Sequence, residues 1–199
     1  MKEKYKQFGE GQYYHIYNRG NNKANIFIDE DDFSFFILRL KQNLFPDDKI
    51  KRIQPLPEGS FSLIAYALMS NHFHLLLRQN KDIPTSKLLA RLCTSYSKYF
   101  NKKYERVGHV FQGRFKQVNI KDDGQLLWLT AYIHQNPCLS NIATKAKDYR
   151  WSSCNEYIKS PDGLCEKGVI LNQFDDKIKY LEFMENALPI LKINKEARQ

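Results

Sequence analysis

Apolar runs of strand length alternate along this chain with segments in which apolar residues recur every three or four positions. Residues 12–19 (QYYHIYNR) alternate in character and are rich in tyrosine, which predicts a first strand. Residues 61–69 and 72–78 are two nearly continuous apolar runs separated by Ser-Asn, which predicts a hairpin in the interior of a sheet. Another strand is expected over residues 115–120, and a short one near residues 50–53.

Three segments between these runs carry the helical pattern. Residues 30–44 begin with acidic residues, which the helix dipole favours, and continue with apolar residues at helical spacing. Residues 84–104 open with proline and serine and place leucines and tyrosines on one face. A third helix is expected to begin near the acidic pair at residues 122 and 123. It should end before Pro137, because a residue that precedes proline disfavours helical backbone.

The order of these elements predicts the fold class. The first six follow the order strand, helix, strand, strand, helix, strand, which matches an α+β ferredoxin-like sandwich with a central antiparallel sheet. Beyond the third helix, residues 172–188 are expected to form a further helix and residues 192–199 a frayed end. We therefore divide the chain into a domain of residues 1–157 and a helical C-terminal extension of residues 158–199.

Charge and cysteine content narrow the class of protein. Lys and Arg number 31 against 22 Asp and Glu, and the net charge of +9 fits a nucleic-acid partner, although solubility alone would also explain it. The N-terminus lacks the apolar region of a signal peptide, and no stretch approaches the roughly 18 apolar residues of a membrane helix. Four scattered cysteines without a CxxC pair suggest reduced thiols in a cytoplasmic protein rather than a zinc site.

Two histidines stand where a buried strand would favour aliphatic residues. His72 and His74 are two positions apart, so their side chains project from the same face, while Phe73 points into the core. Two imidazoles on one face can converge on a divalent metal. The alternative is a pair of histidines on a half-exposed sheet face, each hydrogen-bonded or solvated.

A second candidate set lies in "AYIHQNP" on the third predicted helix. Tyr132 and Asn136 are four residues apart and therefore share a helix face. Tyr132 offers a phenol, and Asn136 offers a carbonyl oxygen that could be a third metal ligand. The alternative is that Tyr132 packs in the core and Asn136 ends the helix before proline.

A third stretch, residues 96–116, interleaves basic and aromatic side chains. This pattern suits contacts with a nucleic-acid backbone combined with stacking on bases, although a solvated helix face followed by a basic loop would look the same. The basic candidates are Lys98, Lys102, Lys103, Arg114 and Lys116.

Taken together and in this order, the motifs resemble one family. "IAYALMSNHFHLLL", "YSKYFNKKY…GHVFQGRFK", "AYIHQNP" and "YRWSS" are similar to the motifs of the REP-associated tyrosine transposases, and "YHIYNRGNNKANIF" resembles their first strand and loop. This family is a branch of the single-tyrosine HUH transposases, which act on single-stranded DNA. The resemblance covers roughly residues 10–157 and implies a ferredoxin-like sandwich with the tyrosine on a helix beside the sheet.

The resemblance also implies roles for individual residues. His72 and His74 would be the metal ligands of the HUH motif, with Asn136 as the third ligand, and the metal would be Mg²⁺ or Mn²⁺. Tyr132 would be the nucleophile that forms a 5′-phosphotyrosine and leaves a free 3′-OH. No general base for Tyr132 is evident, because His134, two residues further on, lies about 200° around the helix. Within the matching motifs, Arg19 and Gln112 join the basic residues as DNA-binding candidates.

The expected partner is therefore single-stranded DNA or a DNA hairpin of the REP type, and the protein would act as a monomer or a homodimer. Two rival functions use the same scaffold. One is a domesticated, non-catalytic protein that binds DNA or RNA. The other is a metal-dependent phosphodiesterase that uses water and forms no covalent tyrosine adduct. A weaker alternative is a regulatory protein whose C-terminal segment binds a partner.

Overall fold

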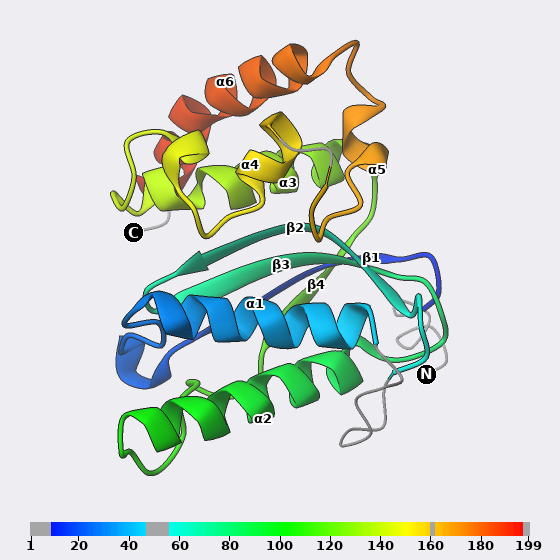
Figure 1. The fold of residues 1–199 in the computed structure, drawn as a ribbon. Coiled ribbons are helices and arrows are strands. Elements are labelled where there is room, and N and C mark those ends of the chain that lie inside the picture. Colours follow the sequence, from blue (N-terminus) through cyan, green and yellow to red (C-terminus); the bar gives the residue numbers. More distant parts are fainter. Residues whose placement is uncertain (1–8, 47–55, 160–161, 197–199) are drawn as a thin grey trace, which may run out of the picture.

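A four-stranded antiparallel sheet forms the centre of the computed structural model, which describes residues 9–46, 56–159 and 162–196 (Figure 1). The strands are β1 (Tyr13–Arg19), β2 (Phe61–Met69), β3 (His72–Gln79) and β4 (Lys116–Ile120). Their order across the sheet is β2-β3-β1-β4. These four strands agree with the sequence prediction to within one residue at each end, whereas the strand expected at residues 50–53 lies outside the described residues.

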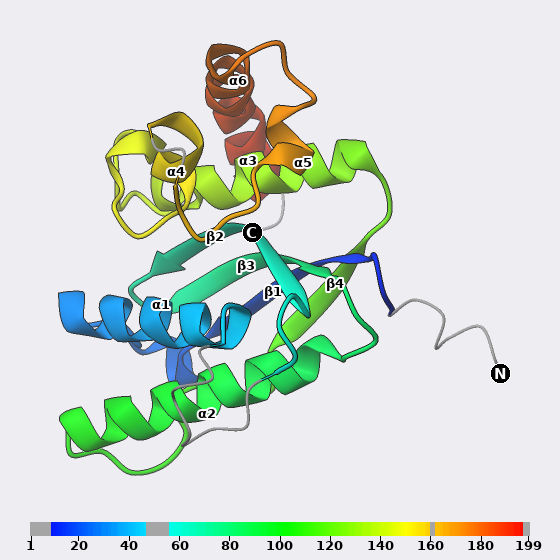
Figure 2. The same ribbon diagram turned by 45° about the vertical axis from the view of Figure 1, so that its right-hand side comes forward.

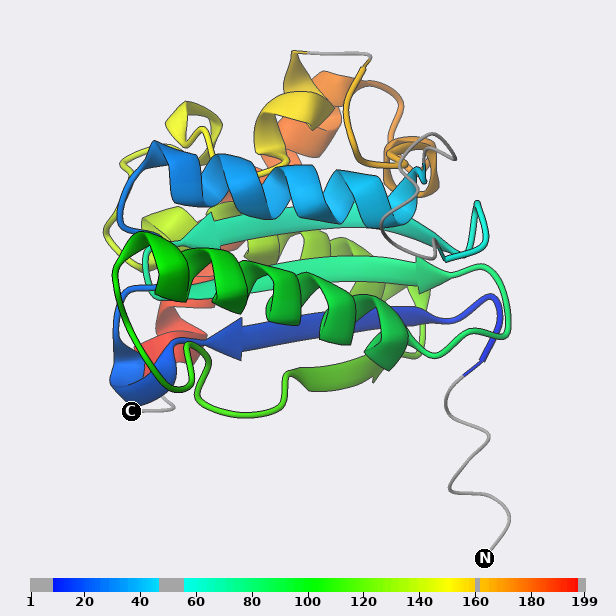
Figure 3. The same ribbon diagram turned by 60° about the horizontal axis from the view of Figure 1, so that its bottom comes forward.

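Helices cover both faces of the sheet. They are α1 (Glu30–Leu44), α2 (Thr85–Lys103) and α3 (Asp123–Leu139). Helices α1 and α2 lie side by side on one face, and α3 lies on the other (Figures 1 and 3). The β-α-β-β-α-β order, with both crossover helices on one face, confirms the predicted ferredoxin-like α+β sandwich.

Strand alternation separates the core from the face that carries the histidines. On β1, Tyr14 and Ile16 are fully buried toward α1 and α2. On β3, Phe73 contacts Phe36 of α1 with ring centroids 5.1 Å apart, as expected from its position between the histidines. Because side chains alternate along a strand, His74 points to the opposite face, beneath α3.

Helix α3 is longer than predicted, and the expected end before Pro137 is wrong. The helix continues through Pro137 to Leu139. Proline in the last turn removes only one backbone donor, and its own carbonyl accepts a hydrogen bond from Ile142 N at 2.8 Å. Asn136 is buried between helix and sheet, so packing holds it in helical conformation despite the following proline.

The C-terminal helix also differs from the prediction at both ends. Helix α6 (Lys177–Glu196) begins five residues later than expected, because the Asp176 carboxylate accepts a hydrogen bond from Lys179 N and caps it. Residues 172–176 form turns, and the residues before them form the short helix α5 (Gly168–Leu171). Helix α6 continues to Glu196, residues 197–199 lie outside the described part, and the frayed end expected from residue 192 stays a prediction.

The segment after α3 packs on the outer side of α3 and along β2 (Figure 2). Its remaining elements are η2 (Ala146–Asp148) and α4 (Cys154–Ile158); a further short helix, η1 (Asn21–Lys23), follows β1. Ser153 N donates to Tyr66 O at 3.0 Å, and Glu166 N donates to Leu63 O at 2.8 Å, so two short segments pair with the outer side of β2. The proposed division at residue 157 falls inside α4 and stays a prediction.

Candidate functional site

The two histidines of β3 lie beneath the two candidate residues of α3. The rings of His72 and His74 have centroids 5.3 Å apart. The Asn136 amide lies over both, with Oδ1 3.4 Å from His72 Nε2 and Nδ2 3.4 Å from His74 Nε2. The Tyr132 ring stands edge-on to His74 at a centroid distance of 5.6 Å. The fold thus brings together all four residues selected as nucleophile and metal ligands.

Burial keeps the centre of this site uncharged. His74 is 6% exposed, and burial, with smaller contributions from nearby His15 and His72, lowers its pKa well below the usual value. Burial also lowers the pKa of His15 to about 4. Both rings are therefore neutral near pH 7, and the neutral imidazole is the form that binds metals.

The donor set fits a divalent cation. In residues 9–46, 56–159 and 162–196, no three His, Cys, Asp or Glu side chains cluster as metal ligands. The third ligand beside His72 and His74 would therefore be the Asn136 amide, whose two polar atoms lie at equal distances from the two Nε2 atoms. Two imidazole nitrogens and an amide oxygen suit Mn²⁺ and can also accommodate Mg²⁺.

A third histidine at this site was not anticipated. His15 of β1 points to the same face, and its Nε2 lies 2.8 Å from His74 Nδ1. Its ring also lies edge-on to Tyr132 at a centroid distance of 6.2 Å. Alternation along β1 could have placed His15 on this face. Its contact with His74 depends on the register between β1 and β3, which local sequence does not specify.

Two of the basic candidates flank the histidine pair. Arg19 is the register partner of His72, and its charge is close enough to contribute to the lowered pKa of His74. Lys116 of β4 lies opposite Tyr17 in the register, with its Nζ 6.0 Å from the centre of that ring. Two exposed cations are thus positioned beside the candidate metal ligands.

Lys98 and Arg114 lie elsewhere, in a hollow of about 540 Å³ between α2 and residues 108–114. Thr94, Ser97 and Asn101 add hydroxyl and amide groups to its lining. The exposed Gln112 does not line the hollow, but its backbone N donates to Arg19 O at 2.9 Å. The loop beside the hollow therefore runs next to the end of β1 that also carries Arg19.

Comparison with known proteins now identifies the family. Residues 10–136, more than half of the chain and a stretch that includes all four central site residues, match the family model described as IS200-like transposase. The chain belongs to the IS200-like transposase family. Membership supports a transposase-like role in binding and nicking DNA. No curated protein matches the chain.

One solved structure agrees with this IS200-like assignment at the level of fold. A REP-associated tyrosine transposase bound to a REP hairpin is similar with a TM-score of 0.56 and 15% sequence identity, over 78% of this chain and 84% of that one. A presumed transposase from Deinococcus radiodurans has a TM-score of 0.40 and 12% identity, over 65% of this chain and 89% of that one. No helix among the described residues is long and apolar enough to span a membrane.

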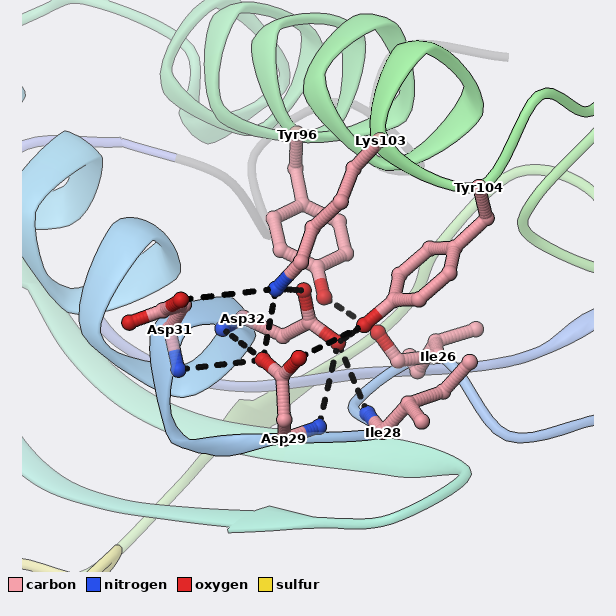
Figure 4. Close-up of polar contacts among 8 residues, drawn as sticks. All are labelled: Ile26, Ile28, Asp29, Asp31, Asp32, Tyr96, Lys103 and Tyr104. Atoms are coloured by element: carbon pink, nitrogen blue, oxygen red, sulfur yellow. Dashed lines mark hydrogen bonds and ion pairs between the residues drawn. The ribbon is translucent and has the colours of Figure 1, made fainter.

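Lys102 and Lys103 do not line the hollow in this IS200-like protein. Lys102 is exposed at the end of α2. The Lys103 ammonium lies 2.6 Å from Asp29 Oδ1 and 3.0 Å from Asp32 Oδ1 (Figure 4). Burial alone would lower the pKa of Lys103, but these bonds outweigh it and raise the pKa. Much of the Lys103 charge is therefore compensated within the protein.

His134 has a structural position on the far side of α3. Its Nδ1 lies 2.6 Å from the Tyr180 hydroxyl of α6, and its Nε2 lies 2.8 Å from Ser153 Oγ. Burial lowers its pKa to about 3. Since both ring nitrogens are engaged, His134 joins α3 to the C-terminal segment and is not available as a base for Tyr132, in agreement with its expected position around the helix.

Proposed function

We propose that this protein is a metal-dependent single-stranded DNA transesterase that nicks and rejoins DNA through a 5′-phosphotyrosine on Tyr132. The observation that carries the proposal is the convergence of Tyr132 and Asn136 of α3 on His72 and His74 of β3. A DNA hairpin of the REP type is the proposed substrate, because the similar REP-associated transposase is bound to one.

The proposed reaction is an exchange of phosphodiester bonds. Tyr132 Oη forms a bond to phosphorus, the bond from phosphorus to the 3′ oxygen breaks, and the phenol proton leaves while the departing oxygen is protonated to a 3′-OH. The phosphotyrosine retains the phosphoester bond, so a DNA 3′-OH can reverse the step and join strands without ATP. A divalent cation held by His72, His74 and Asn136 would supply charge neutralisation at the phosphate.

The remaining residues would position the strand. A phenol with a pKa near 10 is a poor nucleophile at neutral pH, so alignment with the phosphate matters greatly. Arg19 and Lys116 flank the histidines and would hold the phosphates next to the scissile bond. Lys98 and Arg114 would hold a more distant part of the DNA in the hollow beside α2.

The alternative activity is a phosphodiesterase that uses water, and the position of a DNA label separates the two. A hairpin oligonucleotide labelled at its 3′ end is incubated with the protein and Mn²⁺, and the products are separated on a denaturing gel. A 5′-phosphotyrosine would move the label to the mass of the protein, whereas hydrolysis would release a short labelled fragment. The adduct should be absent when EDTA replaces Mn²⁺, and hydrolysis alone would refute the proposal.

The hollow makes a separate prediction about the salt dependence of binding. Lys98→Ala and Arg114→Ala should each weaken DNA binding and reduce the slope of log Kd against log salt concentration by about one for each lost phosphate contact. Lys103→Ala should reduce the slope less, because Asp29 and Asp32 already compensate its charge. The slope is measured by fluorescence anisotropy with labelled hairpins.

Lys179→Ala is the matched control, since Lys179 lies on α6 and pairs with Glu182 at 3.0 Å. Its slope should equal that of the unmodified protein. Unchanged slopes in both Lys98→Ala and Arg114→Ala would show that the hollow does not contact phosphates.

A further inference from the structure

Asn71, in the turn between β2 and β3, is hydrogen-bonded on both sides of its amide. Its Nδ2 donates to the carbonyl of Lys23 at 3.2 Å, and its Oδ1 lies 2.6 Å from His72 Nδ1. A backbone carbonyl can only accept, so it determines which end of the amide faces Lys23. The end that faces His72 is therefore the oxygen, and His72 Nδ1 must carry the proton of this bond.

This arrangement determines what His72 presents to α3. In the neutral ring with a proton on Nδ1, the lone pair is on Nε2. That nitrogen lies 3.4 Å from Asn136 Oδ1, which accepts a long hydrogen bond from Ser140 Oγ at 3.5 Å, so the lone pair of His72 faces an acceptor. A cation could bind both atoms in this arrangement, whereas a proton on Nε2 would block the ligand position.

His15 is placed to do the same for His74. His15 Nε2 lies 2.8 Å from His74 Nδ1, and His74 Nε2 lies 3.4 Å from Asn136 Nδ2, a donor that a lone pair on Nε2 can accept from until a cation replaces it. If Nδ1 of His74 donates to His15, then the Nε2 lone pair of His74 is also directed toward Asn136. The two histidines would then have the same tautomer, each held by a different neighbour.

We propose that Asn71 and His15 are positioning residues that hold His72 and His74 in the tautomer with Nδ1 protonated, so that both Nε2 lone pairs are available to one divalent cation. This inference rests on the proposed function in one respect, the placement of the metal at these histidines. Neighbours that bond the second nitrogen of a ligating histidine fix its orientation and tautomer and raise metal affinity.

The loop after β1 holds Asn71 in place. Gly20 N donates to Asn71 O at 2.8 Å, and the backbone nitrogens of Ile26 and Phe27 donate to Ser70 O at 2.7 and 2.9 Å. A side chain at Gly20 would place its Cβ 2.1 Å from the carbonyl oxygen of Ala24, so only glycine allows this approach. The turn that carries Asn71 is therefore fixed by backbone bonds as well as by the Asn71 amide.

The test measures tautomers and metal affinity without DNA. Protein with ¹⁵N-labelled histidine rings reports by NMR which nitrogen of each ring is protonated, and electron paramagnetic resonance of free Mn²⁺ reports metal binding. Asn71→Leu keeps the side-chain shape but removes the acceptor. It should allow a proton on His72 Nε2 and weaken Mn²⁺ binding by about ten- to a hundredfold. Asn71→Asp keeps the acceptor but loses the donor to Lys23; because backbone bonds also hold the turn, it should retain the tautomer and most of the affinity.

His15 is tested in the same way. His15→Phe should release the tautomer of His74 and weaken Mn²⁺ binding by a similar factor, and His15→Gln, whose amide oxygen can still accept, should restore much of the loss. Asn43→Leu is the matched control, because the Asn43 amide also donates to a backbone carbonyl, that of Arg39, but lies on α1. It should change neither measurement.

Two results would overturn the inference. One is an unchanged His72 tautomer and Mn²⁺ affinity in Asn71→Leu. The other is an equal loss of affinity in Asn71→Leu and Asn71→Asp, which would indicate a merely structural role. The proposed function is tested separately. The expected tautomers and Mn²⁺ affinities without a DNA adduct would refute the transesterase but not the positioning roles. A DNA adduct together with unchanged tautomers in the Asn71 and His15 variants would refute the positioning roles but not the transesterase.

Discussion

Replacing Tyr132 with phenylalanine is expected to abolish the covalent DNA adduct and to reduce cleavage by at least about a thousandfold. The substitution removes the atom that would attack phosphorus and leaves the aromatic ring that packs beside His74 and His15. DNA binding should change little, because the basic residues beside the site and in the hollow are retained. The measurements are adduct formation on a denaturing gel with 3′-labelled hairpin DNA, and hairpin affinity by anisotropy.

Tyr13→Phe provides the matched control. Tyr13 begins the same strand as His15 and faces the same side of the sheet, but it pairs with Arg78 and Ile120 at the end away from the two histidines. The Tyr13→Phe variant should cleave DNA at the normal rate. Normal cleavage by Tyr132→Phe, with both DNA fragments released, would refute the tyrosine mechanism and favour the phosphodiesterase.

The second large effect is expected on stability, from Asp32→Ala. Asp32 is fully buried at the start of α1, and its carboxylate accepts hydrogen bonds from Lys103 Nζ, the Tyr104 hydroxyl and the backbone nitrogens of Ile28 and Asp29 (Figure 4). Removing the carboxylate leaves these donors without their acceptor and separates the start of α1 from the end of α2. We expect the free energy of unfolding to fall by about 3 kcal/mol, measured by urea denaturation.

The neighbouring Asp31 is a suitable comparison. Its side chain is 84% exposed and lies 3.8 Å from Lys103, so Asp31→Ala should change the free energy of unfolding by no more than about 0.5 kcal/mol. Equal effects of Asp32→Ala and Asp31→Ala would show that the buried carboxylate of Asp32 stabilises the fold no more than an exposed one.

Local sequence was sufficient to predict most of the secondary structure. The run at residues 61–69 and the helix at residues 30–44 match β2 and α1, because each combines a clear hydrophobic period with a distinct boundary. The predicted helix end before Pro137 was wrong, because the packing of Asn136 against the sheet outweighs the local preference of a residue before proline for extended backbone. At α6 the sequence did contain a start signal, since Asp176 is a good capping residue, but the predicted helix of residues 172–188 placed Asp175 and Asp176 in its interior.

The candidate site could be predicted only in part, because several of its contacts join segments that are distant in the sequence. His72, His74, Tyr132 and Asn136 occur in short motifs, and the face of each element follows from its period. The contacts of His15 and Asn71 depend on strand register and on the course of the loop after β1, which are set by contacts between distant segments. The position of Lys103 beside Asp29 and Asp32 could not be seen from a basic run alone, because the partners are more than 70 residues away.

The short segments that pair with the outer side of β2 have a consequence for solubility. An open strand edge can recruit a strand from another molecule and begin aggregation. Here residues 152 and 165 form bridges to β2, and within the described chain only β4, five residues long, pairs on one side alone. Lys116 on β4 adds a charge to that edge, which opposes strand addition. The longest apolar strand in the sheet is thus shielded from other copies by the same C-terminal segment that covers α3.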